Sequence, residues 1–272
     1  MSAVNDTFLP VDDILSLQNV SVQFGGVRAV SGVSLALRRG QLTGLIGPNG
    51  AGKTTLFNLI TGSVRPTGGE ILFKGQSIAG KSPDVLCHLG IARTFQNIRL
   101  FPKMTAFENV ALGLHSLPQY TLAEAFIRTR RAQRAEEGVR RRVYELLEMV
   151  DLHDQALLVA GNLPYGLQRR LELARAMATT PELLLLDEPA AGMNADECHD
   201  LIGMIEGIHA AQGYTILLIE HHMHVVMELC RNSTIHVLNL GELLASGSPG
   251  AIQRDERVVA AYLGTKRNHH AA

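Results

Sequence analysis

A glycine-rich segment directly after a predicted apolar strand constrains the fold of this 272-residue chain more than any other feature. Residues 47–54 match the pattern G-x-x-x-x-G-K-[ST], between a strand predicted at residues 42–46 and a helix predicted at 53–61. Glycines let backbone N–H groups turn inward and form a concave anion site, to which the start of a helix adds unpaired donors and partial positive charge. Lys53 supplies a point charge for β and γ phosphates, and Thr54 supplies a hydroxyl ligand for Mg²⁺. The segment therefore predicts a phosphate loop.

Two carboxylates follow a second apolar strand. Four leucines at residues 183–186 precede Asp187 and Glu188. Buried strands of open α/β sheets carry such residues to the carboxyl edge of the sheet, where ligands bind. Asp187 suits the Mg²⁺ shell, and Glu188 suits a general base that orients water on a γ-phosphate. The alternative is that these two carboxylates are simply solvated at a strand end. The phosphate loop in the same chain favours the catalytic interpretation.

Apolar patterning predicts the organisation of the rest of the chain. Residues 15–24 alternate as in a strand, with a phase slip near Asn19 that indicates a bulge or break. Between residues 121 and 150, arginines and glutamates interleave with apolar residues at helical spacing, which predicts a helical insert. After residue 151, near-continuous apolar strands alternate with helices. This alternation predicts a mainly parallel sheet that is covered on both faces.

Composition excludes several classes of protein. With 46% hydrophobic and 19% charged residues, the chain can bury a core, and a net charge of −1 gives no basic field for nucleic acid. The three cysteines (Cys87, Cys198 and Cys230) have no C-x-x-C spacing, which excludes a disulfide scaffold and fits a reducing cytosol. No stretch approaches the roughly 20 apolar residues of a membrane span. Residues 1–10 lack the pattern of a signal peptide.

Taken in order, these motifs resemble the ATP-binding subunits of ABC transporters. Besides the two motifs above, Phe95 and Gln96 resemble the Q-loop of that family, and residues 219–221 resemble its switch-histidine segment. Residues 162–170 stand where the signature L-S-G-G-Q belongs. Further segments are similar to the LivG-type subunit of branched-chain amino-acid importers, namely residues 92–96, 99–101, 104–105, 187–194, 219–221 and 261–264.

The resemblance implies a single ABC ATP-binding domain over residues 1–272. Its fold would be α/β, with a P-loop NTPase (RecA-like) core of mainly parallel sheet, an antiparallel β subdomain and an inserted α-helical subdomain. Residues 13–95 and 180–245 would form the ATP-binding core. About residues 96–179 would form the helical subdomain with the signature segment, and residues 246–272 the C-terminal helices and tail.

The resemblance also implies which residues bind ATP and Mg²⁺. The ATP-binding set is Phe24, Gly47, Pro48, Asn49, Gly50, Ala51, Gly52, Lys53, Thr54 and Thr55. Phe24 matches the aromatic residue that stacks on adenine, and a core aromatic on a strand is the alternative. The Mg²⁺ ligands would be Thr54, Gln96 and Asp187.

Three residues would act in catalysis: Glu188, His221 and Gln96. His221 would contact the γ-phosphate and hold Glu188 and water in line, with a structural histidine as the alternative. Gln96 would reach Mg²⁺ and the attacking water and would couple the site to a membrane partner, with a surface-loop glutamine as the alternative. The arginine-rich residues 128–142 are interpreted as a solvated helix face, with a docking surface as the alternative.

The signature segment departs from the pattern of the family. Pro164 replaces the serine, Tyr165 one glycine and Leu167 the glutamine, while Gly166 remains. Proline fits just before a helix, and the helix start still offers backbone donors. We therefore expect the backbone of Tyr165, Gly166 and Leu167 to contact the nucleotide of a partner subunit. Asn194 stands in the D-loop and could hydrogen-bond across the dimer, with a helix N-cap as the alternative.

The function implied is that of a subunit that binds and hydrolyses ATP to power an importer of branched-chain or related amino acids. Its partners would be a homologous, LivF-type ATP-binding subunit, two transmembrane permeases and an external solute-binding protein, with no nucleic acid. Its place would be cytoplasmic, peripheral on the cytoplasmic face of the inner membrane. Three alternatives are open: the motor of a related urea, amide or lipopolysaccharide transporter, an ABC ATPase that acts on ribosomes or DNA, and a small-molecule P-loop kinase. The third would lack the signature segment and the switch histidine.

Overall fold

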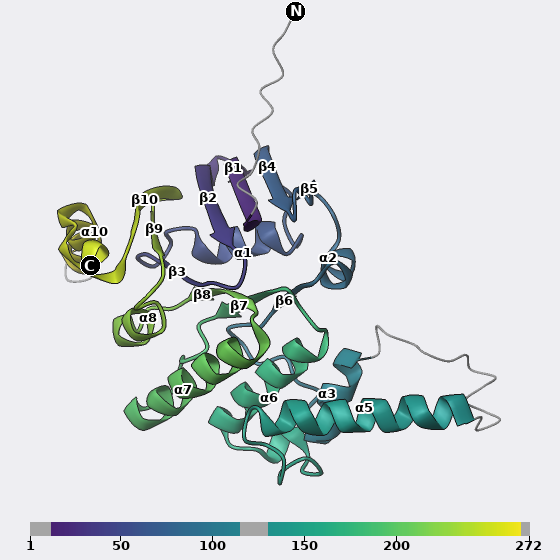
Figure 1. Ribbon diagram of the computed structural model, residues 1–272. Coiled ribbons are helices and arrows are strands. Elements are labelled where there is room, and N and C mark those ends of the chain that lie inside the picture. The colour runs from purple at the N-terminus through teal and green to yellow at the C-terminus, as the bar shows by residue number, and fades with distance from the viewer. Residues whose placement is uncertain (1–11, 115–129, 268–272) are drawn as a thin grey trace, which may run out of the picture. The chain divides into compact units, whose positions relative to one another are not determined.

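The computed structural model describes residues 12–114 and 130–267, with side chains for residues 12–114 and 133–263 (Figure 1). The chain forms two compact units, which are Met1–Leu86 together with Gly213–Ala272, and Cys87–Gln212. Both contain strands and helices, so the fold is α/β as the sequence predicts. The finer division into core and helical subdomain, at residues 95 and 180, stays a prediction. Within the two described ranges, no helix is both long and apolar enough to cross a bilayer.

The first unit contains an antiparallel sheet of four strands. Their order is β2–β1–β4–β5, with bounds Asp13–Phe24 for β1, Val27–Arg38 for β2, Gly68–Phe73 for β4 and Gln76–Ser77 for β5. In β2, Val33, Leu35 and Leu37 are buried while the residues between them are exposed. Alternation of this kind places one face of the strand on the core and the other toward solvent.

The predicted slip in β1 is present at Asn19. The pairing register with β2 shifts between Leu17 and Val20, and Asn19 has a φ of 51°. Asparagine tolerates this left-handed conformation better than most residues. A Cβ on Gly69, whose φ is +81°, would lie 2.3 Å from the Asn19 carbonyl oxygen, so only glycine fits beside the bulge. The sequence prediction of a bulge is confirmed.

The same unit holds four strands in the order β10–β9–β3–β8, with bounds Leu42–Ile46 for β3, Thr215–Ile219 for β8, Ile235–Asn239 for β9 and Glu242–Gly247 for β10. Strand β3 pairs in parallel with both β8 and β9, and β10 pairs antiparallel with β9. Every residue of β3 and β8 is buried, as expected for parallel strands. Because the carboxyl ends of β3 and β8 meet at one edge, the segments that follow both strands start from that edge.

Among the described residues of the first unit, the helices are α1 (Lys53–Ile60), α8 (Met223–Leu229), α9 (Pro249–Arg254) and α10 (Glu256–Arg267). Helix α1 ends at Ile60, one residue before the predicted end, and Gly62, which the sequence predicts to stop the helix, has a φ of 71°. Helix α2 (Pro83–Leu89) crosses from the first unit into the second.

In the second unit, β6 (Ile91–Arg93) pairs in parallel with β7 (Leu183–Asp187). The helices are α3 (Ala106–Gly113), α5 (Arg130–Glu148), α6 (Tyr165–Ala178) and α7 (Ala195–Gln212), with a 3-10 turn at Ala160–Asn162. The register pairs Arg93 with Leu185, so the residues that follow β6 and β7 come together at the carboxyl edge of this pair. The sequence did not predict α2 or α3.

Helix α5 is amphipathic and packs beside α3 and α6 (Figure 1). Its apolar residues lie on one buried face, made by Val143, Leu146 and Leu147, and Val150 continues that face just beyond the helix end. Arg134, Arg140 and Arg141 are exposed on the other face. Exposure of these described side chains fits both the solvated face and the docking surface, so the interpretation of the arginine-rich stretch stays a prediction.

Asn109 on α3 generates a prediction about stability. Its side chain has no exposed area, its Oδ1 accepts the Phe101 N–H at 2.9 Å, and its Nδ2 donates to the carbonyls of Phe101 (3.1 Å) and Thr105 (3.0 Å). Asn109→Ala removes these three side-chain hydrogen bonds, although the Thr105 carbonyl keeps the backbone N–H of residue 109, and we expect the free energy of unfolding to fall by about 1–3 kcal/mol. Urea unfolding measures the change.

Asn162→Ala is the matched control, because Asn162 is exposed in the same unit. We expect it to change the free energy of unfolding by less than about 0.5 kcal/mol. Equal stability of the Asn109→Ala and Asn162→Ala proteins would contradict the role given to the buried amide.

Candidate functional site

The phosphate loop, residues 47–54, joins β3 to α1, and its path admits only glycine at two points. Gly47 has a φ of 151°, and a Cβ there would lie 2.1 Å from the carbonyl oxygen of Leu238 on β9. Gly52 has a φ of 100°, and a Cβ there would lie 2.6 Å from the carbonyl oxygen of Ala29. Both contacts are shorter than any side chain tolerates, so the neighbouring strands fix the loop.

The start of α1 presents backbone donors to this loop. The first helical hydrogen bond runs from the Leu56 N–H to the Gly52 carbonyl at 2.9 Å. The N–H groups of Thr54 and Thr55 therefore have no partner within the helix. No side chain caps this helix at Gly52, so the donors remain available to an anion.

The ammonium group of Lys53 contacts the backbone of the same loop. Its Nζ donates to the carbonyl oxygens of Gly47 at 2.7 Å and Pro48 at 3.0 Å, and only 7% of the residue is exposed. A buried ammonium beside helix-start donors forms a cradle with positive potential. This geometry fits a chain of phosphates, as the sequence predicts.

Phe24 lies at the carboxyl end of β1 with 50% of its surface exposed. The half-exposed ring rules out the alternative of a core aromatic. A flat apolar surface open to solvent is what stacking on a base requires. The role of Phe24 toward adenine stays a prediction.

His221 is exposed and follows β8, and Glu220 before it is fully buried. One carboxylate oxygen of Glu220 accepts the N–H groups of His221 at 3.0 Å and His222 at 3.2 Å, and lies 3.1 Å from the His222 Nδ1. Glu220 thus fixes the backbone from which the His221 ring projects. The sequence analysis placed Glu220 in the switch-histidine segment but gave it no role, because a lone glutamate gives no signal that it is buried.

The C-terminal helix also reaches the phosphate loop. Burial raises the pKa of the Tyr262 hydroxyl on α10, and the Gly47 backbone amide beside it acts in the opposite direction. Tyr262 belongs to one of the segments that are similar to LivG-type subunits. The structure therefore gives that segment a place beside the loop.

In the second unit, the carboxyl edge of β6 and β7 collects four polar side chains. Arg93 Nη2 lies 2.6 Å from Asp187 Oδ2, with side chains that are 7% and 2% exposed. Gln96 Nε2 donates to Glu188 Oε2 at 2.7 Å. Glu188 is 8% exposed and has a φ of 50°. Asp187, Glu188 and Gln96 are therefore brought together, with Arg93 as a partner that the sequence did not reveal.

The donor chemistry of the predicted Mg²⁺ ligands fits that ion. Because the amide nitrogen of Gln96 donates to Glu188, its amide oxygen remains to act as a ligand. That oxygen, the Asp187 carboxylate and the Thr54 hydroxyl are all hard oxygen donors, which Mg²⁺ prefers.

The signature segment forms the start of α6. Pro164 stands at the N-cap without a side-chain cap, and the first helical hydrogen bond runs from the Gln168 N–H to the Pro164 carbonyl at 3.0 Å. The N–H groups of Tyr165, Gly166 and Leu167 therefore have no intrahelical partner. Their contact with a partner's nucleotide stays a prediction.

Asn194 is the N-cap of α7. The sequence analysis gave this cap as the alternative to a hydrogen bond across the dimer. Its Oδ1 accepts the Glu197 N–H at 3.0 Å, and its own N–H donates to Glu197 Oε2 at 2.9 Å. A Cβ on Gly166 would lie 3.5 Å from the other oxygen of Glu197, so this carboxylate also borders the signature segment. The predicted role of Asn194 across a dimer remains a prediction.

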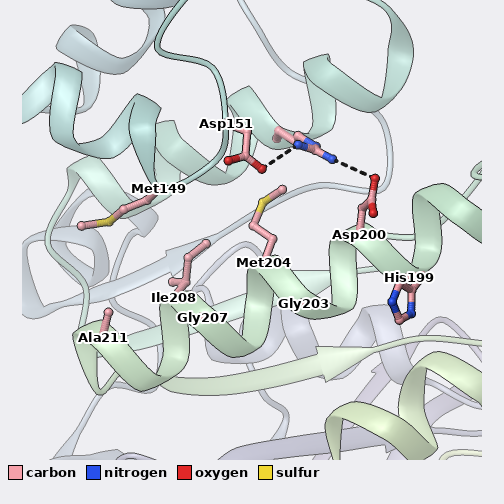
Figure 2. A pocket seen from close by; sticks show the side chains of 10 residues that line it. Met149, Asp151, His199, Asp200, Gly203, Met204, Gly207, Ile208 and Ala211 are labelled. Atoms are coloured by element: carbon pink, nitrogen blue, oxygen red, sulfur yellow. Dashed lines mark hydrogen bonds and ion pairs between the residues drawn. The ribbon is translucent and has the colours of Figure 1, made fainter.

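A separate pocket of about 630 Å³ lies along α7 in the second unit (Figure 2). Arg170 Nη1 lies 3.0 Å from Asp151 Oδ2, and Arg170 Nη2 lies 3.6 Å from Asp200 Oδ2. Figure 2 labels both of these aspartates. The rest of the lining is Met149, His199, Gly203, Met204, Gly207, Ile208 and Ala211. None of the predicted site residues lines this pocket.

Comparisons with known proteins match two families. Residues 30–191 match the ABC transporter family, and residues 242–267 match the branched-chain amino acid ATP-binding cassette transporter family. The first match contains the phosphate loop, the Q-loop, the signature segment and the carboxylate pair. The second contains Tyr262.

Relatives support the same assignment over nearly the whole chain. The high-affinity branched-chain amino acid transport ATP-binding protein LivG of Escherichia coli (strain K12) is 43% identical over 251 residues, which cover 92% of this chain and 98% of that protein. The solved ADP conformation of an ATP-binding cassette of an ABC transporter is 32% identical, with a TM-score of 0.79, and covers 93% of this chain and 99% of that one. A dimeric cassette in a post-hydrolysis state, bound to ADP and Pi, is 25% identical, with a TM-score of 0.71 over 86% of this chain and 98% of that one.

The position of Lys53 predicts the result of removing its charge. Lys53→Ala deletes the ammonium over the phosphate loop while the backbone donors remain, so we expect the dissociation constant for Mg²⁺·ATP to rise about tenfold to a hundredfold. Isothermal titration calorimetry measures it. Lys81→Ala is the control, because Lys81 is exposed in the same unit and outside the loop. Equal affinities of the two variants would contradict the cradle.

Proposed function

Because the chain belongs to the family of ABC transporter ATP-binding subunits, we propose that it is the ATP-hydrolysing motor of an importer of branched-chain or related amino acids. The chain carries the ATPase domain of that family, which binds nucleotide. The observation that carries the proposal is the phosphate loop, with its glycine-only path, the helix-start donors of α1 and the buried Lys53.

The phosphates of ATP bind the loop, and the adenine stacks on Phe24. Helix-start N–H groups and Lys53 bind the β and γ phosphates, where negative charge increases as the terminal bond breaks. Pro48, Asn49, Gly50 and Ala51 supply the backbone that encloses the phosphates. Thr54, Gln96 and Asp187 would hold Mg²⁺, which would supply positive charge against the phosphates.

Glu188 acts as the general base toward the attacking water. Its 8% exposure and the hydrogen bond from Gln96 hold one carboxylate oxygen in a fixed direction. The Glu188 carboxylate accepts the proton of the water. Arg93 Nη2 lies 2.6 Å from Asp187 Oδ2, and this ion pair fixes the direction of the Asp187 carboxylate.

His221 orients the γ-phosphate, and Glu220 orients His221. Because the Glu220 carboxylate accepts the N–H groups of both His221 and His222, the start of α8 is held at the edge of the sheet. A histidine on a fixed backbone donates to an oxyanion without first having to be ordered.

Two cassettes together complete each ATP site. The first turn of α6 offers the N–H groups of Tyr165, Gly166 and Leu167 to the γ-phosphate of a second, homologous cassette of the LivF type. Asn194 lies on the same face of the dimer. Closure is driven by ATP because the closed pair binds ATP more tightly than the open one. The dimeric relative supports such pairing within the family.

The other partners are two transmembrane permeases and an external solute-binding protein. The chain itself acts on the cytoplasmic face of the cell membrane, where ATP is available. The amino-acid class comes from the LivG relative and from the match of residues 242–267 to the branched-chain family. The solute never touches a motor subunit, so the residues of this chain do not select it.

Glu188→Gln tests the general base. The amide cannot accept the proton of water, so we expect hydrolysis to fall about a hundredfold to ten-thousandfold while ATP binding remains. Phosphate release and nucleotide affinity are measured on the same preparation. Asp196→Asn is the control, because it neutralises an exposed carboxylate on α7. Wild-type turnover by the Glu188→Gln protein would show that another group is the base.

Gln96→Ala tests coupling to the permeases. The loop of Gln96 follows β6 and leads toward α3, so it can respond both to the nucleotide and to a membrane partner. We expect permease-stimulated hydrolysis to fall more than the basal hydrolysis of the isolated chain. Equal fractional losses in the two assays would contradict coupling and leave a local role at the metal.

A further inference from the structure

Arg169 on α6 is a buried arginine whose guanidinium contacts four separate groups. Its side chain is 4% exposed, and it lies within the signature segment, two residues after Leu167. Its partners are the hydroxyl of Tyr165, the carbonyl oxygens of Phe95 and Gln96, and the carboxylate of Glu172. A planar fork of this kind satisfies several acceptors in fixed directions, which a lysine cannot do.

On one side, Arg169 contacts the signature segment. Its Nε and Nη2 donate to the Tyr165 hydroxyl at 3.1 and 2.8 Å, one helical turn apart. Tyr165 is 46% exposed, so its ring is accessible to a partner while its hydroxyl accepts hydrogen bonds from Arg169. A Cβ on Gly192 would lie 3.4 Å from the Tyr165 Cε1, so the ring also lies against the loop that follows Glu188.

On the other side, Arg169 holds the backbone of the Q-loop. Nη1 donates to the Phe95 carbonyl at 2.6 Å, and Nη2 donates to the Gln96 carbonyl. The Gln96 side chain in turn donates to Glu188 at 2.7 Å. A continuous series of contacts therefore runs from Tyr165 through Arg169 and Gln96 to Glu188.

Glu172 keeps the guanidinium in place. It lies 3.4 Å from Arg169 Nη1, and its other oxygen accepts the Arg99 N–H at 3.2 Å. Burial raises the pKa of the Glu172 carboxyl, while the Arg99 N–H and the charge of Arg169 act in the opposite direction. Two buried charges are costly unless their partners are satisfied, so any movement of Arg169 has to carry its acceptors with it.

We propose that Arg169 is a positioning residue that transmits contact at Tyr165 to Gln96 and Glu188 of the same subunit, and so couples the two ATP sites of the dimer. The inference rests on the proposed function, in which Tyr165 faces the nucleotide of the partner and Glu188 acts on the subunit's own. When the partner's ATP engages the first turn of α6, the shared guanidinium fixes the Q-loop carbonyls. Gln96 then holds Glu188 in its working direction, which favours hydrolysis at the second site.

Tyr165→Phe in the full chain, paired with its partner ATPase subunit, tests the proposal. The change removes only the hydroxyl and keeps the ring and the backbone donors. We expect kcat for Mg²⁺·ATP to fall about threefold to thirtyfold, with KM changed less than about twofold, because the phosphate loop is untouched. In a Gln96→Ala background, Tyr165→Phe should cause no further loss, because both changes break one series of contacts.

Tyr144→Phe is the matched control, since it removes a tyrosine hydroxyl from α5 in the same unit. Tyr144 packs against Phe107 and His153 and does not touch the Q-loop contacts. We expect its kcat to stay within about twofold of the wild type. Arg169→Lys keeps the charge but not the fork, and we expect it to lose turnover as Tyr165→Phe does. Thermal melting of each variant excludes unfolding as the cause of a loss.

Unchanged kcat in Tyr165→Phe would overturn the proposal, and so would losses from Tyr165→Phe and Gln96→Ala that multiply. Glu188→Gln, measured beside them, separates this failure from failure of the proposed function. If Glu188→Gln is inactive while Tyr165→Phe is normal, only the coupling is wrong. If Glu188→Gln still hydrolyses ATP, the catalytic assignment on which the coupling rests is wrong.

Discussion

The approach of the Gly47 backbone to β9 is the constraint on which the nucleotide site depends. A Cβ at this position would meet the Leu238 carbonyl at 2.1 Å, so the chain can leave β3 only along a path that excludes side chains. This path brings the loop directly to the start of α1, where the backbone donors and Lys53 face inward. The pairing of β3 with β9, which forms part of the core, therefore also fixes the path of the phosphate loop.

In the second unit, buried charge pairs fix the positions of the polar side chains. Arg93 with Asp187, and Arg169 with Glu172, have side chains that are at most 7% exposed. Pairs of this kind contribute little net stability, because the cost of removing charges from water offsets their attraction. Their benefit is geometric, since each one fixes a group for which a role toward ATP is proposed, or a neighbour of such a group. A hydrophobic replacement would retain the packing and lose that direction.

The sequence predicts the parts of this fold whose pattern is local. Strict alternation in β2, the slip at Asn19 and the helix after Gly52 follow from periodicity and from residue type. Helix α3 was missed because its eight residues are too few for a clear period. Its signal was the pair of Thr105 and Glu108, which cap each other across the first turn.

Contacts between distant segments are what the sequence could not supply. Arg169 and Glu172 are three residues apart on a helix, a spacing typical of exposed ion pairs, yet both are buried under the Q-loop. Glu220 looks like an ordinary polar residue until β8 carries it to the sheet edge. Roles toward ATP came from family resemblance, and burial and hydrogen bonding came only from the structure.

The central claim is that each ATP site is completed by the signature segment of the other subunit, and mixed pairs test it most directly. Gly166→Asp places a carboxylate beside Glu197 and against the approaching γ-phosphate. Hydrolysis is measured in pairs in which a Glu-to-Gln change silences one site at a time. The account predicts that Gly166→Asp blocks the site whose phosphate loop belongs to the partner and spares the site that contains its own Lys53. Loss only at its own site would contradict the account.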